Sequence, residues 1–215
     1  EGLRLALVVN DMAEVNVDAL QVQGAQLLQA GEKMVELSNG CICCTLREDL
    51  LTSLAALAAE GRFDFALVES SGISEPLPVA ETFTFEDASG HSLGAVAELD
   101  NLVTVVDGCA FLAELGSVDS LRARGWEAAA GDERRVAHLL ADQVEFADVL
   151  VLNKVDLISE EERGRIRAVL ARCNPRAEVI ETSFGQVAPG ALFGKRRFSL
   201  ARAAESPKWL PEGRA

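Results

Sequence analysis

The sequence lacks an excess of basic residues. Its 215 residues include 20 lysines and arginines against 34 aspartates and glutamates, so the formal net charge is −14 at pH 7. A nucleic-acid partner requires a basic stripe along one face of the protein, and no such stripe is visible. We therefore exclude DNA and RNA as partners.

Long apolar segments are missing as well. No apolar run reaches the roughly 18 residues that a membrane-spanning helix requires. The opening run LRLALVV is too short for the apolar part of a signal peptide, and the polar NDMAE follows it at once. The sequence thus predicts neither membrane insertion nor secretion.

Cysteines are few, and their distribution is uneven. The chain has five, an odd number, and three of them are clustered as Cys41, Cys43 and Cys44. Adjacent Cys43 and Cys44 are poorly placed to pair with each other, which argues against a disulfide scaffold. We expect a reducing, cytoplasmic location, where a thiol cluster is more often metal-binding or reactive. Cys109 and Cys173 lie on apolar segments, and we expect them to be small core residues.

Short apolar runs alternate with helical patterns along the chain. Strands are predicted at Leu3–Val9, Lys33–Leu37, Asp64–Val68, Leu102–Val106, Val149–Leu152 and Glu178–Glu181. The apolar residues within 46–57, 136–144 and 166–170 each fall on one helical face. This alternation predicts an α/β fold, a doubly wound and mostly parallel sheet covered by helices.

One of these helices has clear signals at both ends. Ser159 and Glu162 have capping-box spacing at its start, and the run Cys173-Asn174-Pro175 should end it. Residues 83–101 interrupt the alternation, and we expect them to form a loop or a small excursion.

Polar segments follow five of the predicted strands: NDMAEVNVD, SNGCICC, ESSG, NKVD and TSFG. Ligands of doubly wound sheets bind at the carboxyl ends of the strands. We therefore expect these segments to meet at one edge of the sheet and to form a binding site there.

The NKVD segment, Asn153 to Asp156, has the composition and position of a loop that recognises guanine. Guanine offers two adjacent donors on one edge, and the ionised Asp156 can accept both, whereas adenine would leave the carboxylate half satisfied. Lys154 would lay its aliphatic stem along the ring, and Asn153 would tie neighbouring loops together. A chance match is the alternative, and the position directly after a strand argues against it.

Two further strand ends carry weaker signals. Glu69 can hold Mg²⁺ through water, and Gly72 allows a backbone N–H to approach a γ-phosphate. The alternative is an exposed glutamate before a Ser-Gly turn. The segment Thr182 to Gly185, with Ser183 at its centre, lies where a loop could offer a backbone N–H to the guanine carbonyl.

The clustered cysteines lie just ahead of a predicted helix. Thr45 and Glu48 have capping-box spacing, so Cys43 and Cys44 lie outside a helix N-terminus, where the dipole favours thiolate. Three soft ligands suit Zn²⁺ and leave a fourth position for another group. The alternative is a set of buried or merely redox-sensitive cysteines.

The carboxylates of the NDMAEVNVD segment are candidates for that fourth position. They are Asp11, Glu14 and Asp18, if the segment folds over the site. The two histidines, His91 and His138, have no cysteine at ligand spacing, and we expect them in a loop and on a helix surface.

Together the motifs resemble the CobW-like metallochaperone GTPases of the zinc-chaperone type, which join a P-loop GTPase domain to a C-x-C-C motif. The matching segments occur in the family's order and cover almost the whole chain: NDMAEVNVDA, GCICCTLREDL, FDFALVESSGISEP, VTVVDG, VLNKVDL and ETSFG. The resemblance implies a P-loop NTPase-like fold and a GTP hydrolase that uses GTP, Mg²⁺ and Zn²⁺. The implied partners are a client metalloprotein and GTP or GDP, and a homo-oligomer is compatible with the sequence.

The resemblance also implies roles for individual residues. Glu69 is implied to be a Walker-B-like residue and Gly72 a γ-phosphate sensor, which makes them the catalytic candidates. The nucleotide would be held by Asn153, Lys154, Asp156, Ser183 and Asp18. The metal would be held by Cys41, Cys43, Cys44 and Glu14.

One motif of that family is absent. No G-x-x-x-x-G-K-[ST] phosphate-binding loop occurs in the 215 residues. In the family this loop follows the first strand, so we expect residues 1–200 to be a GTPase core without its first strand and phosphate loop. Residues 201–215 would be a linker toward a C-terminal domain, and the isolated fragment should be inactive.

Two other functional classes remain open at this point. The first is a metal-sensing or metal-storing module without turnover, for which the nucleotide site would be vestigial. The second is a thiol oxidoreductase that uses Cys41 and Cys44, which would leave the carboxylate and NKVD loops without a role.

The two-acceptor argument generates a prediction. In the whole protein, Asp156→Asn should relax the preference for guanine, because an amide presents a donor where guanine also presents one. The expected loss is about 1–3 kcal/mol of discrimination between guanine and adenine nucleotides. Competition binding of the two nucleotide classes measures it, and equal selectivity in both proteins would contradict the assignment of the guanine loop.

Overall fold

The computed structural model describes residues 3–9, 33–36, 45–70, 72–84, 92–126 and 134–205. The chain divides into two compact units. The first comprises Glu1–Ser74 and Pro78–Glu98, and the second comprises Glu75–Leu77 and Leu99–Ala215. Each unit has its own sheet, and each is described by itself below.

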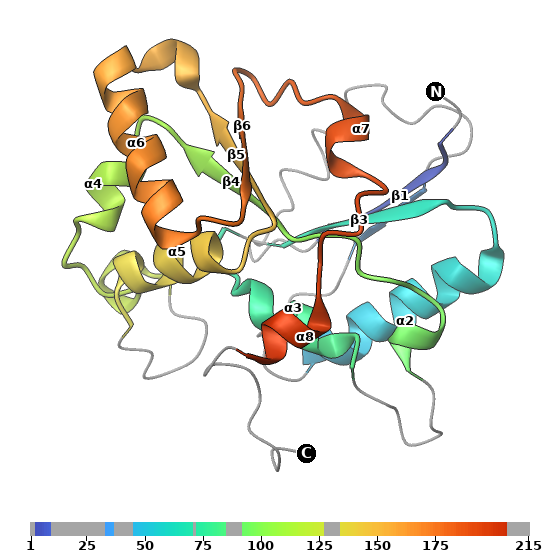
Figure 1. The fold of residues 1–215 in the computed structure, drawn as a ribbon. Coiled ribbons are helices and arrows are strands. Elements are labelled where there is room, and N and C mark those ends of the chain that lie inside the picture. Colours follow the sequence, from blue (N-terminus) through green and yellow to red (C-terminus); the bar gives the residue numbers. More distant parts are fainter. Residues whose placement is uncertain are drawn as a thin grey trace. The chain divides into compact units, whose positions relative to one another are not determined.

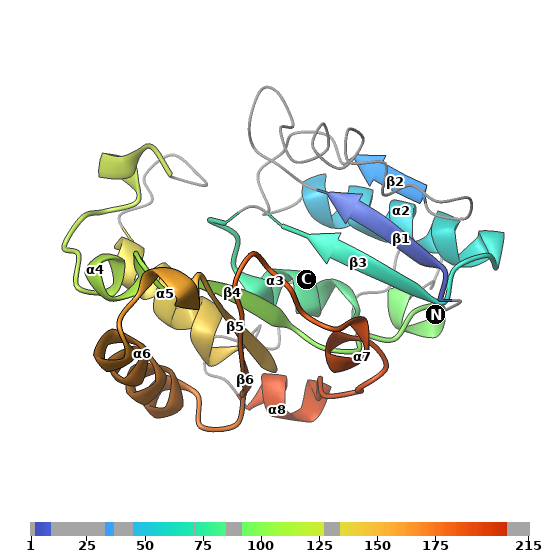
Figure 2. The same ribbon diagram turned by 90° about the horizontal axis from the view of Figure 1, so that it is seen from above.

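The sheet of the first unit is parallel, with strand order β2-β1-β3. Figure 2 shows β1 (Leu5–Val9) between β2 (Lys33–Glu36) and β3 (Phe65–Glu69). At the start of the sheet, the backbone N–H of Arg4 and its guanidinium both donate to the Asp64 carboxylate. This pairing fixes β3 against β1, so that Val9 and Glu69 are level at the carboxyl end.

Helix α2 (Thr45–Glu60) provides the apolar side chains that cover this sheet. Leu50, Leu54 and Leu57 are buried with Ala6 and Val8 of β1 in one core. The predicted leucine stripe is therefore confirmed at these three positions, and the helix begins at Thr45 as predicted. The side chains of residues 45–49 lie outside the described residues.

The segment expected to be a loop contains one core residue. Within its described part, the 3₁₀ helix η1 (Leu93–Ala95) begins after Ser92, whose hydroxyl accepts from the N–H of Gly94. Leu93 is fully buried in the core of the first unit. Phe83 and Ala97 of the same segment are partly buried against that core, so the described part of the excursion is anchored at isolated positions that leave no periodicity in the sequence.

The sheet of the second unit is also parallel, with strand order β4-β5-β6 (Figure 1). Its strands are β4 (Val103–Asp107), β5 (Val149–Asn153) and β6 (Glu178–Glu181). The first four residues of the central strand, VLVL, are all buried, as expected for a strand covered on both faces. All six predicted strands are therefore present, and the α/β fold with parallel sheets is confirmed.

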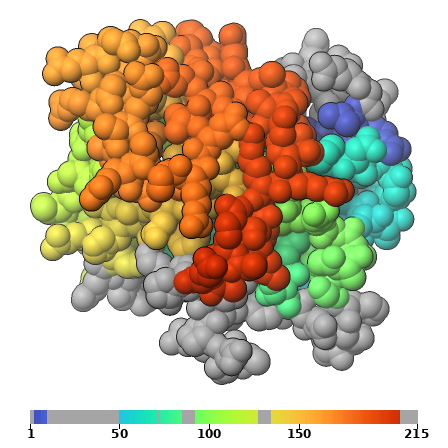
Figure 3. All heavy atoms as spheres, in the orientation of Figure 1, coloured from blue at the N-terminus to red at the C-terminus, as the bar shows by residue number. Residues whose placement is uncertain are grey.

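Two longer helices cover the second sheet. They are α5 (Val136–Glu145) and α6 (Glu160–Cys173), and Val144, Ile166 and Leu170 from them pack with Leu150 and Leu152 of β5. The α6 helix begins with the predicted capping box between Ser159 and Glu162. The other face of α6 is polar and exposed. Orange atoms from this part of the chain form part of the surface in Figure 3.

The remaining helices are short and were not predicted. They are α3 (Pro76–Thr82), α4 (Phe111–Leu115), α7 (Pro189–Leu192), α8 (Leu200–Ala204), and the 3₁₀ helices η2 (Arg122–Arg124) and η3 (Val155–Leu157). Segments of three to seven residues do not complete two turns, so they leave no helical period in the sequence. None of the helices in the described ranges is long and apolar enough to cross a membrane.

The prediction for the two isolated cysteines is wrong. Cys109 and Cys173 are both exposed and free. Cys109 lies in the turn after β4, and Cys173 is the last residue of α6, where the helix surface turns to solvent. Their apolar neighbours, not the cysteines themselves, provide the core. His138 is exposed on α5, as expected.

Asn174 connects three segments of the second unit. Its side-chain amide donates to the carbonyls of Val144 at 2.8 Å, Glu145 at 3.0 Å and Ala147 at 2.8 Å. Its side-chain oxygen accepts from the N–H groups of residues 176 and 177. Since Asn174 is only 7% exposed, water cannot easily replace these partners.

Asn174→Ala should therefore destabilise the protein by about 2–3 kcal/mol, because it leaves several buried backbone groups unpaired. Urea-induced unfolding should show a lower midpoint with an unchanged slope. Arg172→Ala, an exposed change two residues away on α6, is the control and should stay within about 0.5 kcal/mol of the wild type. Equal midpoints for Asn174→Ala and the wild type would contradict the role of this side chain.

Candidate functional site

Three polar loops leave the same edge of the second sheet. Asp107 ends β4 level with Asn153 at the end of β5, and Leu152 is level with Glu181 at the end of β6. The loops that follow carry the sequences DG, NKVD and TSFG. Parallel pairing thus brings together segments that are far apart in the chain.

Asn153 holds these three loops to one another. Its backbone carbonyl accepts from the N–H of Gly108 at 3.0 Å, and its side-chain oxygen accepts from the N–H of Gly185 at 3.0 Å. The N–H of Val155 also donates to the carbonyl of Thr182 at 3.2 Å. These are the contacts expected of a residue that ties neighbouring loops together.

Gly108 is required by the closeness of its loop to Asn153. A Cβ atom at this position would lie 3.0 Å from the Asn153 carbonyl oxygen and 3.1 Å from Cδ1 of Ile158. Both contacts are tighter than ordinary van der Waals packing, and one partner is backbone that cannot easily move. The loop after β4 therefore approaches the backbone of Asn153 too closely for a side chain at position 108.

Lys154 has a left-handed backbone, with φ of 63° and ψ of 31°. Its Nζ atom lies 2.7 Å from the Oδ2 atom of Asp107, and the Oδ1 atom of Asp107 accepts from the N–H of Cys109 at 2.8 Å. The four-carbon stem of Lys154 is thus held at both ends, by its own backbone and by Asp107. A stem fixed in this way presents its apolar surface in one position, whereas the stem of a flexible lysine would not.

The two charged groups stabilise each other's ionised forms. Burial alone would raise the pKa of Asp107, but the hydrogen bonds from Lys154 and from the N–H of Cys109 outweigh it and lower this pKa. The hydrogen bond to Asp107 raises the pKa of Lys154. Both groups are therefore ionised at neutral pH.

Asp156 and Ser183 lie in the two outer loops. Asp156 is exposed in η3, two residues after Lys154. Ser183 is half-buried and follows the buried Thr182. The hydroxyl of Thr182 donates to the carbonyl of Gln186 at 2.8 Å, which closes the TSFG loop on itself. The structure thus places Asn153, Lys154, Asp156 and Ser183 on loops that are hydrogen-bonded together, as the sequence predicted.

Glu69 and Gly72 belong to the first unit. Glu69 is the exposed last residue of β3, level with Val9 of β1, which is itself level with Glu36 of β2. Gly72 lies in the turn that follows, and a methyl group at its Cα would meet no atom within 4 Å. Both residues are therefore at the carboxyl edge of their sheet, in the position predicted for them.

The predicted metal ligands and one nucleotide ligand lie outside the described residues. These are Glu14, Asp18, Cys41, Cys43 and Cys44. Within the described ranges, no group of three or more His, Cys, Asp or Glu residues could hold a metal ion. The roles assigned to Glu14, Asp18, Cys41, Cys43 and Cys44 therefore stay predictions.

Parallel strands under helices, with an NKVD loop at the carboxyl edge, define a P-loop NTPase-like nucleotide-binding protein. The chain belongs to the CobW/HypB/UreG nucleotide-binding domain family, which it matches over residues 1–181. The family resemblance drawn from the motifs is therefore confirmed.

Several relatives are similar over most of this chain. It is 45% identical over 220 positions to zinc-regulated GTPase metalloprotein activator 1 of Dictyostelium discoideum, covering 98% of the chain and 46% of the relative. It is 32% identical to zinc chaperone CobW of a Sinorhizobium species, covering 90% of the chain and 55% of the relative. The chain thus spans about half the length of the curated relatives it matches.

Solved structures show the same fold. A zinc-bound triple mutant of the YjiA GTPase has a TM-score of 0.58 and 26% identity, over 92% of this chain and 54% of the other. Zinc-bound YjiA from Escherichia coli has a TM-score of 0.57 and 20% identity, over 93% of this chain and 63% of the other.

Two residues of this edge were given no role from the sequence. Asp107 and Gly108 occur in the segment VTVVDG, which matched the family but carried no assignment. Their position at the end of a predicted strand was the available signal. What the sequence does not contain is the order of the strands, which makes Asp107 the neighbour of Asn153.

The Asp107–Lys154 pair predicts a pH dependence. Asp107→Asn should lower the free energy of unfolding by about 0.5–1 kcal/mol at pH 7, since both side chains are partly exposed and solvent screens the pair. The pKa of Asp107 is lowered in the folded protein, so its contribution is complete above the unfolded pKa and is lost as the pH falls through the folded value.

The difference between Asp107→Asn and the wild type should therefore shrink as the pH falls below about 4. Urea-induced unfolding at a series of pH values measures it. Asp156→Asn, which changes an exposed carboxylate in the adjacent loop, is the control for the charge change. A difference that grows on acidification would contradict the ion-pair explanation.

Proposed function

We propose that this chain is the nucleotide-binding core of a GTP-hydrolysing metallochaperone that binds Zn²⁺ and delivers it to a client protein. The observation that carries the proposal is the bond from Gly185 N–H to Asn153 Oδ1, which joins the NKVD and TSFG loops in a member of this family. The names of the relatives, a zinc-regulated GTPase metalloprotein activator and a zinc chaperone, support the same activity.

Base recognition belongs to the second unit. The Asp156 carboxylate would accept both donors on the edge of guanine, and the N–H groups near Ser183 would donate to its carbonyl. Lys154, held by Asp107, would lie along the ring. Because these loops are hydrogen-bonded to one another, little ordering would be needed on binding.

The phosphate and metal groups belong to the first unit. Glu69 would hold Mg²⁺ through water, and the N–H of Gly72 would meet the γ-phosphate. Mg²⁺ would neutralise charge that develops on the phosphates during hydrolysis. Asp18 is the proposed further contact to the nucleotide.

Zn²⁺ would be the cargo, bound by Cys41, Cys43 and Cys44 with Glu14 as the fourth ligand. The cysteine segment follows β2 in the sequence, and the segment with Glu14 and Asp18 follows β1. The carboxyl ends of both strands are level with Glu69 in the sheet register. This shared edge supports a coupling between the state of the nucleotide and the affinity for the metal.

Such coupling must be reciprocal. Whatever factor GTP applies to Zn²⁺ affinity, Zn²⁺ must apply to GTP affinity, and typical couplings are about 1–3 kcal/mol. Hydrolysis would then switch the zinc site between a holding and a releasing state.

Calorimetry of the whole protein tests this function. Zn²⁺ affinity should differ by roughly 5- to 150-fold between the states with a non-hydrolysable GTP analogue and with GDP. Binding should collapse when Cys41, Cys43 and Cys44 are all changed to Ser. The control is Cys109→Ser with Cys173→Ser, which removes the two exposed thiols outside the proposed site and should leave binding unchanged.

Identical Zn²⁺ affinity in the two nucleotide states would contradict the chaperone mechanism. It would favour a metal-sensing or metal-storing module without turnover. Equal losses in the triple variant and in the control variant would contradict the assignment of the cysteine loop.

A further inference from the structure

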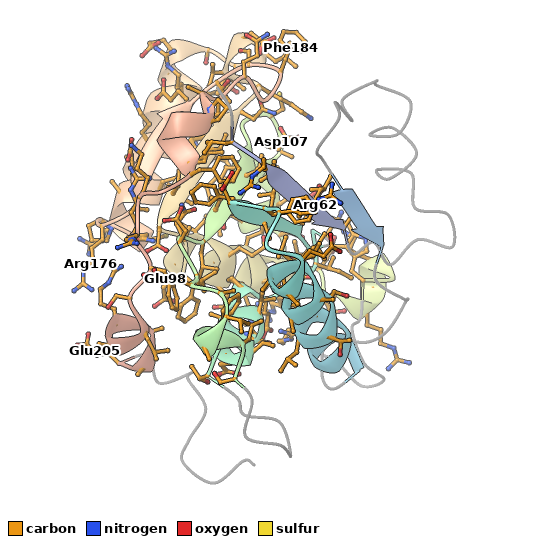
Figure 4. All side chains as sticks on the ribbon, turned by 90° about the vertical axis from the view of Figure 1, so that its right-hand side faces the viewer. Arg62, Glu98, Asp107, Arg176, Phe184 and Glu205 are labelled. Carbon is orange, nitrogen blue, oxygen red and sulfur yellow. The ribbon has the colours of Figure 1, made fainter. Side chains whose placement is uncertain are left out.

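Phe184 is the most exposed large apolar residue in the part of the chain that the structure describes. It is 84% exposed, at the centre of the TSFG loop. Leaving a phenyl ring in water is unfavourable, because its burial would remove a large apolar surface from solvent. Figure 4 shows Phe184 at the outer end of its loop, pointing away from the ribbon.

The backbone of Phe184 is also unfavourable. Its φ of 56° lies in the left-handed region, where the Cβ atom of a residue with a side chain comes too close to the following carbonyl oxygen. A glycine would adopt this conformation freely, as Gly185 does with φ of 65°. Two separate disadvantages therefore coincide at one residue where glycine would remove both.

The surrounding hydrogen bonds hold this strained conformation in place. Gly185 donates to Asn153 Oδ1, the hydroxyl of Thr182 donates to Gln186, and the N–H of Gln186 donates to the carbonyl of Ser183 at 3.2 Å. Strained residues persist where neighbouring structure fixes them in this way, and they cluster at ligand sites.

Another left-handed residue of the second unit has a structural explanation. Arg196 has φ of 48°, and its N–H donates to the Asp100 carboxylate, which also accepts from the N–H of Gly194. The strain at Arg196 is thus offset by a local anchor within the protein. The conformation at Phe184 instead presents a phenyl ring to solvent, where its flat face is available to cover a ligand.

The neighbouring loop shows which ligand would fit. Asn153 bonds the Phe184 loop and leads directly into Lys154, whose stem is held by Asp107. Asp156 follows two residues later with an exposed carboxylate. An aromatic ring, a held aliphatic stem and a carboxylate on joined loops match a flat heterocycle with donors on one edge.

We propose that Phe184 stacks on the purine base of the bound guanine nucleotide, on the face that Lys154 does not cover. This inference rests on the proposed guanine-nucleotide site. The inference gives Phe184 and Asp156 different roles in binding. Every base has a π-face on which Phe184 could stack, while only guanine has the two donors that Asp156 accepts. Phe184 supplies affinity for the base, and Asp156 supplies selectivity.

The test is calorimetric binding of GDP to the whole protein. Phe184→Ala should weaken GDP binding by roughly 5- to 150-fold, the effect of losing one aromatic stacking partner. The ratio of GDP to ADP affinity should stay within about threefold of the wild type, because the Asp156 carboxylate is unchanged. Phe184→Tyr, which keeps the aromatic face, should bind like the wild type.

Two controls isolate the effect on the base. Inorganic pyrophosphate with Mg²⁺ has no base, so its affinity should be the same for Phe184→Ala and the wild type. Val118→Ala removes another strongly exposed apolar side chain, 76% exposed in the same unit, and should leave GDP binding unchanged. The thermal midpoints of both variants should match the wild type, since neither side chain is packed.

The outcomes separate this inference from the proposed function. If wild-type protein does not bind GDP, the proposed function itself fails. If wild-type protein binds GDP and Phe184→Ala binds equally well, stacking is overturned and the exposed ring belongs to a protein-binding surface. An equal loss for pyrophosphate and GDP would also overturn it, because the effect would then not involve the base.

Discussion

The parallel pairing of β4, β5 and β6 in register is the constraint on which the proposed base site depends. It sets Asp107 beside Asn153 and brings the TSFG loop to the same edge. Asn153 then converts proximity into a fixed arrangement, because its carbonyl and its side-chain oxygen bond the loops on either side. A shift of β5 by one residue in this register would turn the Asn153 side chain to the opposite face of the sheet and break its bond to Gly185.

Unfavourable local features concentrate at this edge. Lys154 and Phe184 both have left-handed backbones, and Gly108 makes contacts that leave no room for a side chain. Each would destabilise an isolated loop, but the buried apolar strand β5 and its helices supply the stability that tolerates them. A rigid scaffold with strained loops at the ends of its strands is the arrangement expected of a preorganised binding site.

Much of this could be predicted from the sequence, for identifiable reasons. The strands and the helices α2, α5 and α6 have strong apolar periods, and Ser159 with Glu162 marked a helix start correctly. The NKVD loop was found because its chemistry needs particular residues at fixed spacing. The role of Asp107 was not found, since it depends on which strands are neighbours. Cys109 and Cys173 were misplaced because apolar sequence neighbours do not determine which way a side chain points.

The proposed division of roles between the two sheets also constrains how a nucleotide could control the affinity for a metal. GTP and GDP carry the same base, so the loops around Asn153 would make the same contacts with both. A ligand shifts an equilibrium only through contacts that differ between the two states. The difference must therefore arise at the γ-phosphate, where Glu69 and Gly72 are the candidates. They lie at the carboxyl edge of the sheet whose other strands lead into the segments with the predicted zinc ligands. In the proposed function, the base site would accordingly be rigid and provide affinity, while control of the metal would depend on the edge of the first sheet.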